Sequence, residues 1–278
     1  MISVVITAYN RKEFLYNAIN SLNSQDYRDF EVILVTNFDY NLNRFQSLAI
    51  KNIVMEGSQG LFLYTGIKEA TGDIIVFLDD DTFSPEKLSY IAHLFSNENI
   101  GFIHNNPVFI EGERRYKKLY TPPDFNLSCM SIRKGNIEKY LEDLKSLRTG
   151  SDTFIYCTGL CSGKRAVKRR KFLTFYLKHG GSISELSKKW LTDDLDMAVY
   201  MQSIFHCKKA LKYLQKIEYA NKIKLYTFYD YRIEKKEISG KRLMIFQLWL
   251  YFIYNYFSMG KSIKRVLYQF FLFLKEFL

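Results

Sequence analysis

The sequence predicts an α/β protein with a mainly parallel sheet, helices on both faces of that sheet, and a C-terminal helical appendage. Two observations carry this prediction. Short β-branched runs alternate with helical stripes through the first hundred residues, and residues 241–278 form two aromatic, apolar stretches. The runs are apolar throughout rather than alternating, because parallel strands joined by helices are covered on both faces.

The N-terminal elements follow one another with short connections. Three helices are expected between and after the strands: Arg11–Asn23, Leu61–Ala70, and one opened by Ser84-Pro85-Glu86, with serine as the N-cap and proline at the first position. Ligands bind beyond the carboxyl ends of such strands, so the residues after each strand are the candidates for a site. The expected strands are Ile2–Thr7, Phe30–Val35, Asn52–Met55 and Asp73–Leu78.

Residues 100–205 are more mixed in pattern. Gly101–Ile110 has the composition of a strand, and Arg114–Lys118 is a short basic run. Residues 164–190 are basic and predict helix, with an interruption at Gly180-Gly181.

Charge is distributed unevenly along the 278 residues, whose net formal charge is +11. Residues 205–278 hold 15 Lys/Arg and 5 Asp/Glu, whereas the first 100 residues hold 7 basic and 13 acidic groups. A basic tail is compatible with nucleic acid, anionic lipid or a solvated surface. Its aromatic residues lie in continuous apolar runs rather than between the charges, so we predict no nucleic-acid partner.

The tail contains a charge-free segment, Leu243–Met259, of 17 residues. As a helix it would extend about 26 Å, short of the ~30 Å hydrocarbon core of a bilayer. With basic residues on both sides, residues 241–278 favour a peripheral membrane contact, and packing on protein is the alternative. The chain opens directly on a strand pattern without a signal peptide, which predicts a cytoplasmic protein at the cytoplasmic face of the membrane.

Three consecutive carboxylates, Asp79-Asp80-Asp81, follow an apolar strand. Their mutual repulsion and partial desolvation cost free energy unless they share a cation. Oxygen ligands at this density suit Mg²⁺ or Mn²⁺, particularly with a diphosphate in the remaining positions. A solvated acidic turn that caps the next helix is the alternative.

A second acidic cluster lies far downstream, in Thr192–Met197, at the start of a helical stretch. Sugar transfer from a nucleotide requires one acidic group for a metal and another for a proton. The two clusters together therefore indicate that chemistry.

Four segments, in their order along the chain, resemble the motifs of the family 2 glycosyltransferases of the GT-A fold. They are Ile2–Arg11, Gly66–Asp81, Thr158-Gly159 followed by Arg165, and Thr192–Met197. The resemblance covers residues 2–205. It implies a GT-A-like, Rossmann-type catalytic domain over residues 1–205, with a nucleotide-sugar half at about 1–100 and an acceptor half at about 101–205. Residues 206–278 would form a separate basic, aromatic helical region.

The resemblance also implies roles on the donor side. Thr7 and Tyr9 would line the nucleoside pocket. Asp79, with Asp80 beside it, would contact the donor ribose or the metal, and Asp81 would ligate Mn²⁺ or Mg²⁺.

On the acceptor side, the resemblance makes Asp194 the general base of an inverting transfer. Asp193 would hold the acceptor or position the loop.

One turn departs from the family pattern. Thr36-Asn37-Phe38-Asp39 stands where relatives often carry an acidic D-D-G-S turn. Asn37 could bind the base through its amide oxygen, or Asp39 could reach it. The donor therefore stays open between UDP-, GDP- and dTDP-linked sugars.

The expected activity is that of a family 2-like hexosyltransferase. It would move a sugar from a nucleotide-sugar to a hydroxyl of a glycan or lipid-linked acceptor. The altered turn at Asn37 supports an alternative, a catalytically silent relative that binds nucleotide-sugar or serves as a partner subunit of another glycosyltransferase.

Overall fold

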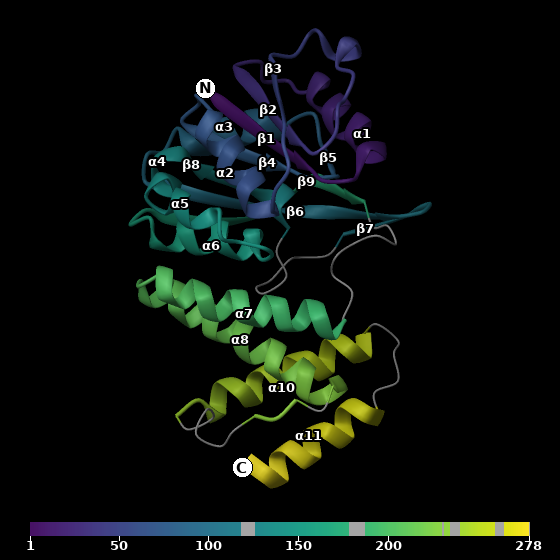
Figure 1. Cartoon of the computed structure of the whole chain (residues 1–278), viewed down its shortest axis with the longest axis vertical. Helices are drawn as coiled ribbons and strands as arrows, with labels where there is room; N and C mark the ends of the chain where they lie inside the picture. The colour runs from purple at the N-terminus through teal and green to yellow at the C-terminus, as the bar shows by residue number, and fades with distance from the viewer. Residues whose placement is uncertain (118–125, 178–186, 230, 234–239, 259–263, 278) are drawn as a thin grey trace. The chain divides into compact units, whose positions relative to one another are not determined.

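The computed structural model describes residues 1–117, 126–177, 187–229, 231–233, 240–258 and 264–277. The chain divides into two compact units, Met1–Ser182 and Ile183–Leu278. The first unit contains the sheet and its helices, and the second is helical (Figure 1). An α/β fold with a helical C-terminal region is therefore confirmed.

The first unit alternates strands and helices in its N-terminal half. Its strands are β1 (Ile2–Ala8), β2 (Phe30–Thr36), β3 (Ile50–Val54), β4 (Ile74–Leu78), β5 (Thr82–Phe83), β6 (Ile100–Glu111), β7 (Arg114–Lys117), β8 (Met130–Arg133) and β9 (Arg165–Leu177). Its α-helices are α1 (Lys12–Asn23), α2 (Gln59–Glu69), α3 (Lys87–Phe95), α4 (Lys134–Ile137), α5 (Leu141–Leu144) and α6 (Ser151–Cys161), with 3₁₀ turns η1 (Asn43–Phe45), η2 (Leu127–Cys129) and η3 (Glu138–Tyr140).

The strands form one sheet in the order β3-β2-β1-β4-β8-β6-β9-β5, with β7 paired to β6. The first four of these strands run parallel, as the N-terminal pattern predicts. Beyond β4 the sheet is mixed, because β8 is antiparallel to both β4 and β6, whereas β6 and β9 are parallel.

Helices cover both faces of the parallel half. Residues of β1 that alternate in sequence point to opposite faces, and Ile2, Val4 and Ile6 pack in one core cluster with α1 and α3. On the other face α2 approaches so closely that a Cβ at Gly66 would lie 2.5 Å from Cγ1 of Val5. A glycine is therefore required where helix and sheet meet.

The basic segment at 164–190, which we expected to be helical, is a strand in its first part and helical at residues 188–190, and the expected interruption at Gly180-Gly181 lies outside the described residues. Residues Arg165–Leu177 form β9, which pairs along its length with β6. Only Phe175 and Thr174 pair with β5 on the other side, so among the described residues the basic part of β9 is an edge. Charged side chains on an edge strand oppose unwanted strand pairing, which gives the basic run a structural explanation.

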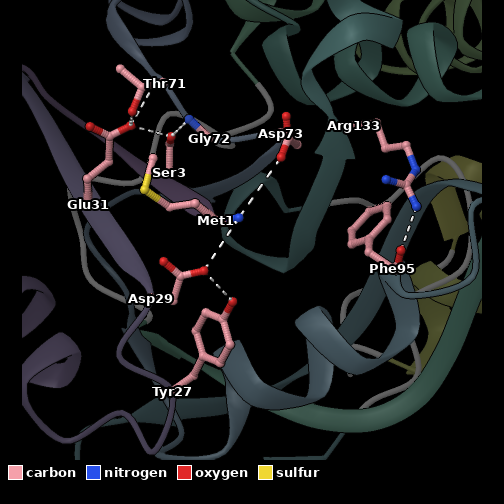
Figure 2. Close-up of polar contacts among 10 residues, drawn as sticks. All are labelled: Met1, Ser3, Tyr27, Asp29, Glu31, Thr71, Gly72, Asp73, Phe95 and Arg133. Carbon is pink, nitrogen blue, oxygen red and sulfur yellow. Dashed lines mark hydrogen bonds and ion pairs between the residues drawn. The ribbon is translucent and has the colours of Figure 1, made fainter.

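The amino-terminal edge of the parallel strands is closed by a polar cluster (Figure 2). The Oε1 atom of Glu31 accepts hydrogen bonds from the Ser3 hydroxyl (2.6 Å), the Thr71 amide (2.6 Å) and the Thr71 hydroxyl (2.7 Å). The Ser3 oxygen in turn accepts from the Gly72 amide (2.8 Å). Burial alone would raise the pKa of Glu31, but these hydrogen bonds outweigh it and the pKa is lowered.

The second unit consists of packed helices around an aromatic core. Its helices are α7 (Lys188–Ile204), α8 (Lys208–Tyr229), α10 (Arg242–Ser258) and α11 (Lys264–Phe277). Trp249 on α10 is fully buried, and it packs in one cluster with residues of α8 and α11. The charge-free segment is thus helical up to Ser258, as expected, and its last residue lies outside the described part of the chain. Within the described residues, none of the helices combines the length and hydropathy that crossing a membrane requires.

The second unit begins at Ile183, whereas the sequence predicts the boundary near residue 205. The difference has a physical reason in the packing of α7 on α8. Gln202 Nε2 on α7 donates to Glu218 on α8 (2.9 Å), and Leu191 and Leu195 of α7 share a core cluster with Leu225 of α8.

Candidate functional site

The carboxyl ends of β1, β2 and β4 meet at one edge of the sheet. Parallel register sets Ile6 beside Leu78 and Ala8 beside Thr36. The segments that follow these three strands are therefore neighbours, and they contain Tyr9, Asn37 and the triplet Asp79–Asp81. Open α/β sheets bind ligands at this edge.

The three carboxylates of the triplet have different surroundings. Asp80 pairs with the Nη1 atom of Arg11. Asp81 is fully buried, and its Oδ1 and Oδ2 atoms accept hydrogen bonds from the Leu177 amide and the Asn126 side chain, both at 3.2 Å. The backbone amide of Asp79 donates to the Ser128 hydroxyl (3.0 Å).

Burial dominates the electrostatics of the triplet. It raises the pKa of Asp81 to about 6, although hydrogen bonds from Ser128, Leu177 and Asn126 oppose the shift. The pKa of Asp79 is raised well above its ordinary value by burial and then by the charges of Asp80 and Asp81, against the opposing charge of Arg11. Negative charge is therefore undercompensated at this edge.

The donor set of the triplet fits a hard divalent cation. All the available ligand atoms are carboxylate oxygens, which Mg²⁺ and Mn²⁺ prefer. A carboxylate has about four lone-pair sites, so even Asp81 retains acceptor capacity beyond its hydrogen bonds to Ser128, Leu177 and Asn126. No group of three or more His, Cys, Asp or Glu side chains able to hold a metal occurs in the described part of the chain. Mg²⁺ is commonly held by one or two carboxylates, with phosphate oxygens and water completing the shell.

The predicted nucleoside pocket has one exposed aromatic ring. Tyr9 is 51% exposed, and its ring contacts Phe62 edge-on with centroids 5.9 Å apart. Thr7, which the resemblance places in this pocket, is buried in β1 with 7% exposure. The exposed ring of Tyr9 is therefore available to stack on a base or ribose, whereas Thr7 is largely inaccessible.

An amide pair closes the turn beside Tyr9. The Asn10 amide donates to Asn37 Oδ1 (2.9 Å), and Asn37 Nδ2 donates to Asn10 Oδ1 (2.8 Å). Asn10 adopts a φ of 54°, in the left-handed region that asparagine tolerates better than most residues. Asp39 is exposed on the same turn. Asn37 Oδ1 therefore already accepts one hydrogen bond, although a carbonyl oxygen can accept a second.

Behind the triplet lies a buried polar group that no sequence signal marks as functional. Lys87, the first residue of α3, is completely buried. Burial lowers its pKa to about 7, although Cys129 and Asp81 oppose the shift. The Nζ atom of Lys87 donates to the Ser128 carbonyl and to the Thr174 hydroxyl (2.9 Å).

The segment that the resemblance assigns to the acceptor side is structural in the first unit. Thr158 lies in α6 and is fully buried, with its hydroxyl donating to the Phe154 carbonyl (3.0 Å). A Cβ at Gly159 would lie 2.6 Å from Cγ of Phe102, so this glycine allows α6 to approach β6. Neither residue presents a group to an acceptor.

The second acidic cluster belongs to the second unit, where α7 carries it. Asp194 is partly buried, and its Oδ2 accepts a hydrogen bond from Asn221 Nδ2 on α8 (2.6 Å). Burial raises the pKa of Asp194, while Asn221 and Lys224 act against the rise. Asp193 is half-buried and Asp196 is exposed. Asn221 is not predictable from the sequence, because only the packing of α7 on α8 brings it to Asp194.

The fold and its acidic carboxyl edge are typical of α/β proteins that bind a nucleotide together with a divalent cation. Residues 3–170 match the family described as Glycosyl transferase family 2. The chain belongs to this family of glycosyltransferase enzymes, which confirms the predicted family.

Known proteins similar to this chain support the same assignment. It is 27% identical to the Escherichia coli UDP-Glc:alpha-D-GlcNAc-diphosphoundecaprenol beta-1,3-glucosyltransferase WfaP over 203 residues, 66% of this chain and 80% of that protein. In structure it resembles S. aureus TarS in complex with UDP-GlcNAc, with a TM-score of 0.61, 17% identity, and coverage of 82% of this chain and 73% of that one. The Pyrobaculum calidifontis mannosyltransferase PcManGT in complex with GDP-Man and Mn²⁺ gives a TM-score of 0.58 at 13% identity, covering 96% of this chain and 85% of that one. These two structural similarities confirm the GT-A-like fold.

Proposed function

We propose that this glycosyltransferase moves a sugar, with inversion, from a nucleotide-sugar to a hydroxyl of a glycan or lipid-linked acceptor, and that it depends on Mn²⁺ or Mg²⁺. The observation that carries the proposal is the undercompensated charge of Asp79–Asp81 at the carboxyl edge of the sheet. Carboxylates whose pKa values are raised by burial and neighbouring charge are candidates for functional sites.

On the donor side, Asp79 and Asp81 would hold the cation, and Arg11 would keep Asp80 oriented through their ion pair. The bound cation would neutralise the diphosphate that leaves with the nucleoside. Tyr9 would stack on the nucleoside, and Thr7 would line the same pocket. Asn37 or Asp39 would contact the base. TarS with UDP-GlcNAc and PcManGT with GDP-Man and Mn²⁺ support a nucleotide-sugar donor and a metal.

On the acceptor side, Asp194 would act as the general base and Asp193 would position the acceptor. In a single displacement, the acceptor oxygen forms a bond to the anomeric carbon while the bond from that carbon to the diphosphate oxygen breaks. The acceptor proton passes to an Oδ atom of Asp194. The raised pKa of Asp194 supports this role, because a general base works best when its pKa lies near the operating pH.

The second unit supports a peripheral contact with the cytoplasmic face of a membrane, through residues 241–278. Basic residues Lys241, Arg242, Lys264 and Arg265 accompany apolar side chains that are exposed on the same two helices. The name of WfaP describes an acceptor linked to diphosphoundecaprenol, which supports a lipid-linked acceptor here. The exposed apolar residues are Leu243 (71%), Leu250 (48%), Tyr254 (71%), Tyr268 (62%), Phe271 (64%) and Leu272 (38%).

The transfer reaction is tested by nucleoside-diphosphate release from UDP-, GDP- and dTDP-sugars with Mn²⁺ or Mg²⁺, with and without a membrane-lipid extract. We expect release from one donor, and a loss of about 10²–10⁴-fold in Asp194→Asn. The matched control Asp196→Asn changes an exposed carboxylate on the same helix and should retain activity. Nucleotide binding without release from any donor would instead favour the catalytically silent relative.

The membrane contact has a separate test, sedimentation with anionic liposomes. The double variant Leu243→Ser/Phe271→Ser should bind them more weakly, because it removes two exposed apolar side chains. Val54→Ser, which changes an exposed residue of the first unit (47%), is the control. Unchanged binding in the double variant would favour packing of these helices on protein.

A further inference from the structure

The buried position of Lys87 needs an explanation, because lysine is almost never fully buried unless it is paired. Its side chain has no exposed surface, and its Nζ atom lies 3.6 Å from the centroid of the Phe83 ring. Burying an ammonium group costs several kcal/mol, and well-packed apolar residues often replace such groups without loss of stability. Stability alone therefore does not account for a lysine here.

The two groups that accept hydrogen bonds from Lys87 belong to the two segments that hold the acidic triplet. The first is the carbonyl of Ser128 in η2, and the hydroxyl of the same residue bonds to the Asp79 amide (3.0 Å) and to the Asp81 carboxylate. The second is the hydroxyl of Thr174 in β9, the strand whose last residue, Leu177, donates to Asp81 Oδ1.

These segments are also joined to each other at Lys87. The Thr174 hydroxyl donates to the Ser128 carbonyl (3.1 Å), so one ammonium group and one hydroxyl converge on the same oxygen. Thr174 pairs with Phe83 in the β5–β9 ladder, immediately after the triplet. Lys87 thus connects α3, η2 and β9 at a single buried point.

We propose that Lys87 is a positioning residue for the acidic triplet, holding η2 and β9 so that Asp79 and Asp81 keep the arrangement that binds a divalent cation with the donor diphosphate. This inference rests on the proposed function. Its physical basis is that Mg²⁺ demands near-ideal ligand geometry and that outer partners orient the ligands, so a shift of the supporting segments weakens binding.

The test compares Lys87→Met with the wild-type chain by calorimetric titration of UDP, GDP and dTDP at a series of Mn²⁺ concentrations. Methionine fills the space without the ammonium group, so we expect the thermal midpoint to be kept or raised. The half-saturating Mn²⁺ concentration should rise about tenfold or more, as for other groups that support metal ligands. Thr174→Val, nearly the same shape without the hydroxyl, should give a smaller change in the same direction.

The control is Leu88→Met, a volume-conserving change at the neighbouring, fully buried position of α3, which should leave the Mn²⁺ dependence unchanged. A stable Lys87→Met protein with wild-type Mn²⁺ dependence would overturn this inference and leave the proposed function intact. Absence of Mn²⁺-dependent nucleotide binding in the wild-type chain would overturn the proposed function and this inference together.

Discussion

The two edges of the parallel sheet carry carboxylates in opposite electrostatic surroundings, Glu31 in β2 at the amino edge and Asp79–Asp81 after β4 at the carboxyl edge. At the amino edge, Glu31 receives three hydrogen bonds, and its pKa is lowered (Figure 2). At the carboxyl edge, Asp79 and Asp81 are crowded with Asp80, and the pKa values of both are raised. The amino edge stabilises its carboxylate by itself, whereas the carboxyl edge leaves charge for a ligand to neutralise.

This difference follows from the balance between burial, neighbouring charges and hydrogen-bond donors at each edge. Strand pairing at the amino edge brings the amides of Thr71 and Gly72 beside Ser3 and Glu31, and these amides donate to acceptors. After β4, three acidic side chains follow one another, and Arg11 forms an ion pair with Asp80. A carboxylate is therefore a candidate for function when burial and neighbouring negative charge outweigh its hydrogen-bond donors, as at Asp79 and Asp81.

The largest effect should come from Asp79→Asn. Loss of this charge should lower the rate of nucleoside-diphosphate release by about a hundredfold or more. The reason is that the cation that would neutralise the diphosphate loses a carboxylate ligand worth several kcal/mol. The free energy of unfolding at pH 7 should stay the same or increase, because repulsion within the triplet is relieved. Initial rates and urea denaturation measure the two quantities. A stability loss with full activity would mean that Asp79 is a structural residue like Glu31.

Glu31→Gln should show the reverse pattern. We expect a loss of about 1.5–3 kcal/mol in unfolding free energy at pH 7, since hydrogen bonds to a charged group are lost, with activity retained. The folded-state pKa of Glu31 is lowered, so its stabilisation is present above the unfolded pKa and is lost as the pH falls through the folded pKa. The difference between variant and wild type should therefore shrink in acid. Glu69→Gln, at a more weakly held carboxylate, is the comparison, and an equal loss there would contradict the role of the Glu31 cluster.

Asp194 lies between these extremes, because it is partly buried and accepts a short hydrogen bond from Asn221. Replacing that donor in Asn221→Leu removes a hydrogen bond to the charged form, so the pKa of Asp194 should rise further. The acid limb of the kcat/KM profile should then move to higher pH, with about a tenfold loss of activity at pH 7. Gln202→Leu removes another hydrogen bond between α7 and α8 and should leave the limb in place. A lower rate without any shift of the limb would argue against Asp194 as the base.

The smallest effect is expected at Asn10 and Asn37, two residues of the carboxyl edge that hydrogen-bond to each other. Asn10→Gly should cost at most about 1 kcal/mol of stability, because glycine accepts the positive φ. Asn10→Ala should cost about 1–2 kcal/mol more, since a Cβ is strained in that conformation. Thermal unfolding of both variants measures the difference, and equal stabilities would mean that the turn relaxes to another conformation.

Local patterns in the sequence predict the alternating half of the fold well. The expected strands and helices up to residue 95 agree with β1–β4 and α1–α3 to within a few residues, because apolar periodicity acts over short distances. The expected capping of α3 by Ser84 is wrong, because the helix begins at Lys87 after Glu86 as its N-cap. The pattern fails at β9, where lysine and arginine favour helix but pairing with β6 prevails. The pattern predicts a helical region over residues 206–278, but it gives no sign that Asn221 of α8 lies beside Asp194.

Motifs along the chain predict the family. Short-range patterns predict the parallel half of the sheet and the edge at which Asp79–Asp81 gather, since both depend on neighbours within a few residues or on strand direction. How those carboxylates are held follows from tertiary packing alone. Lys87 bonds to Ser128 across 41 residues and Leu177 to Asp81 across 96. Such contacts have no local period, because they arise from the packing of separate elements around one buried point.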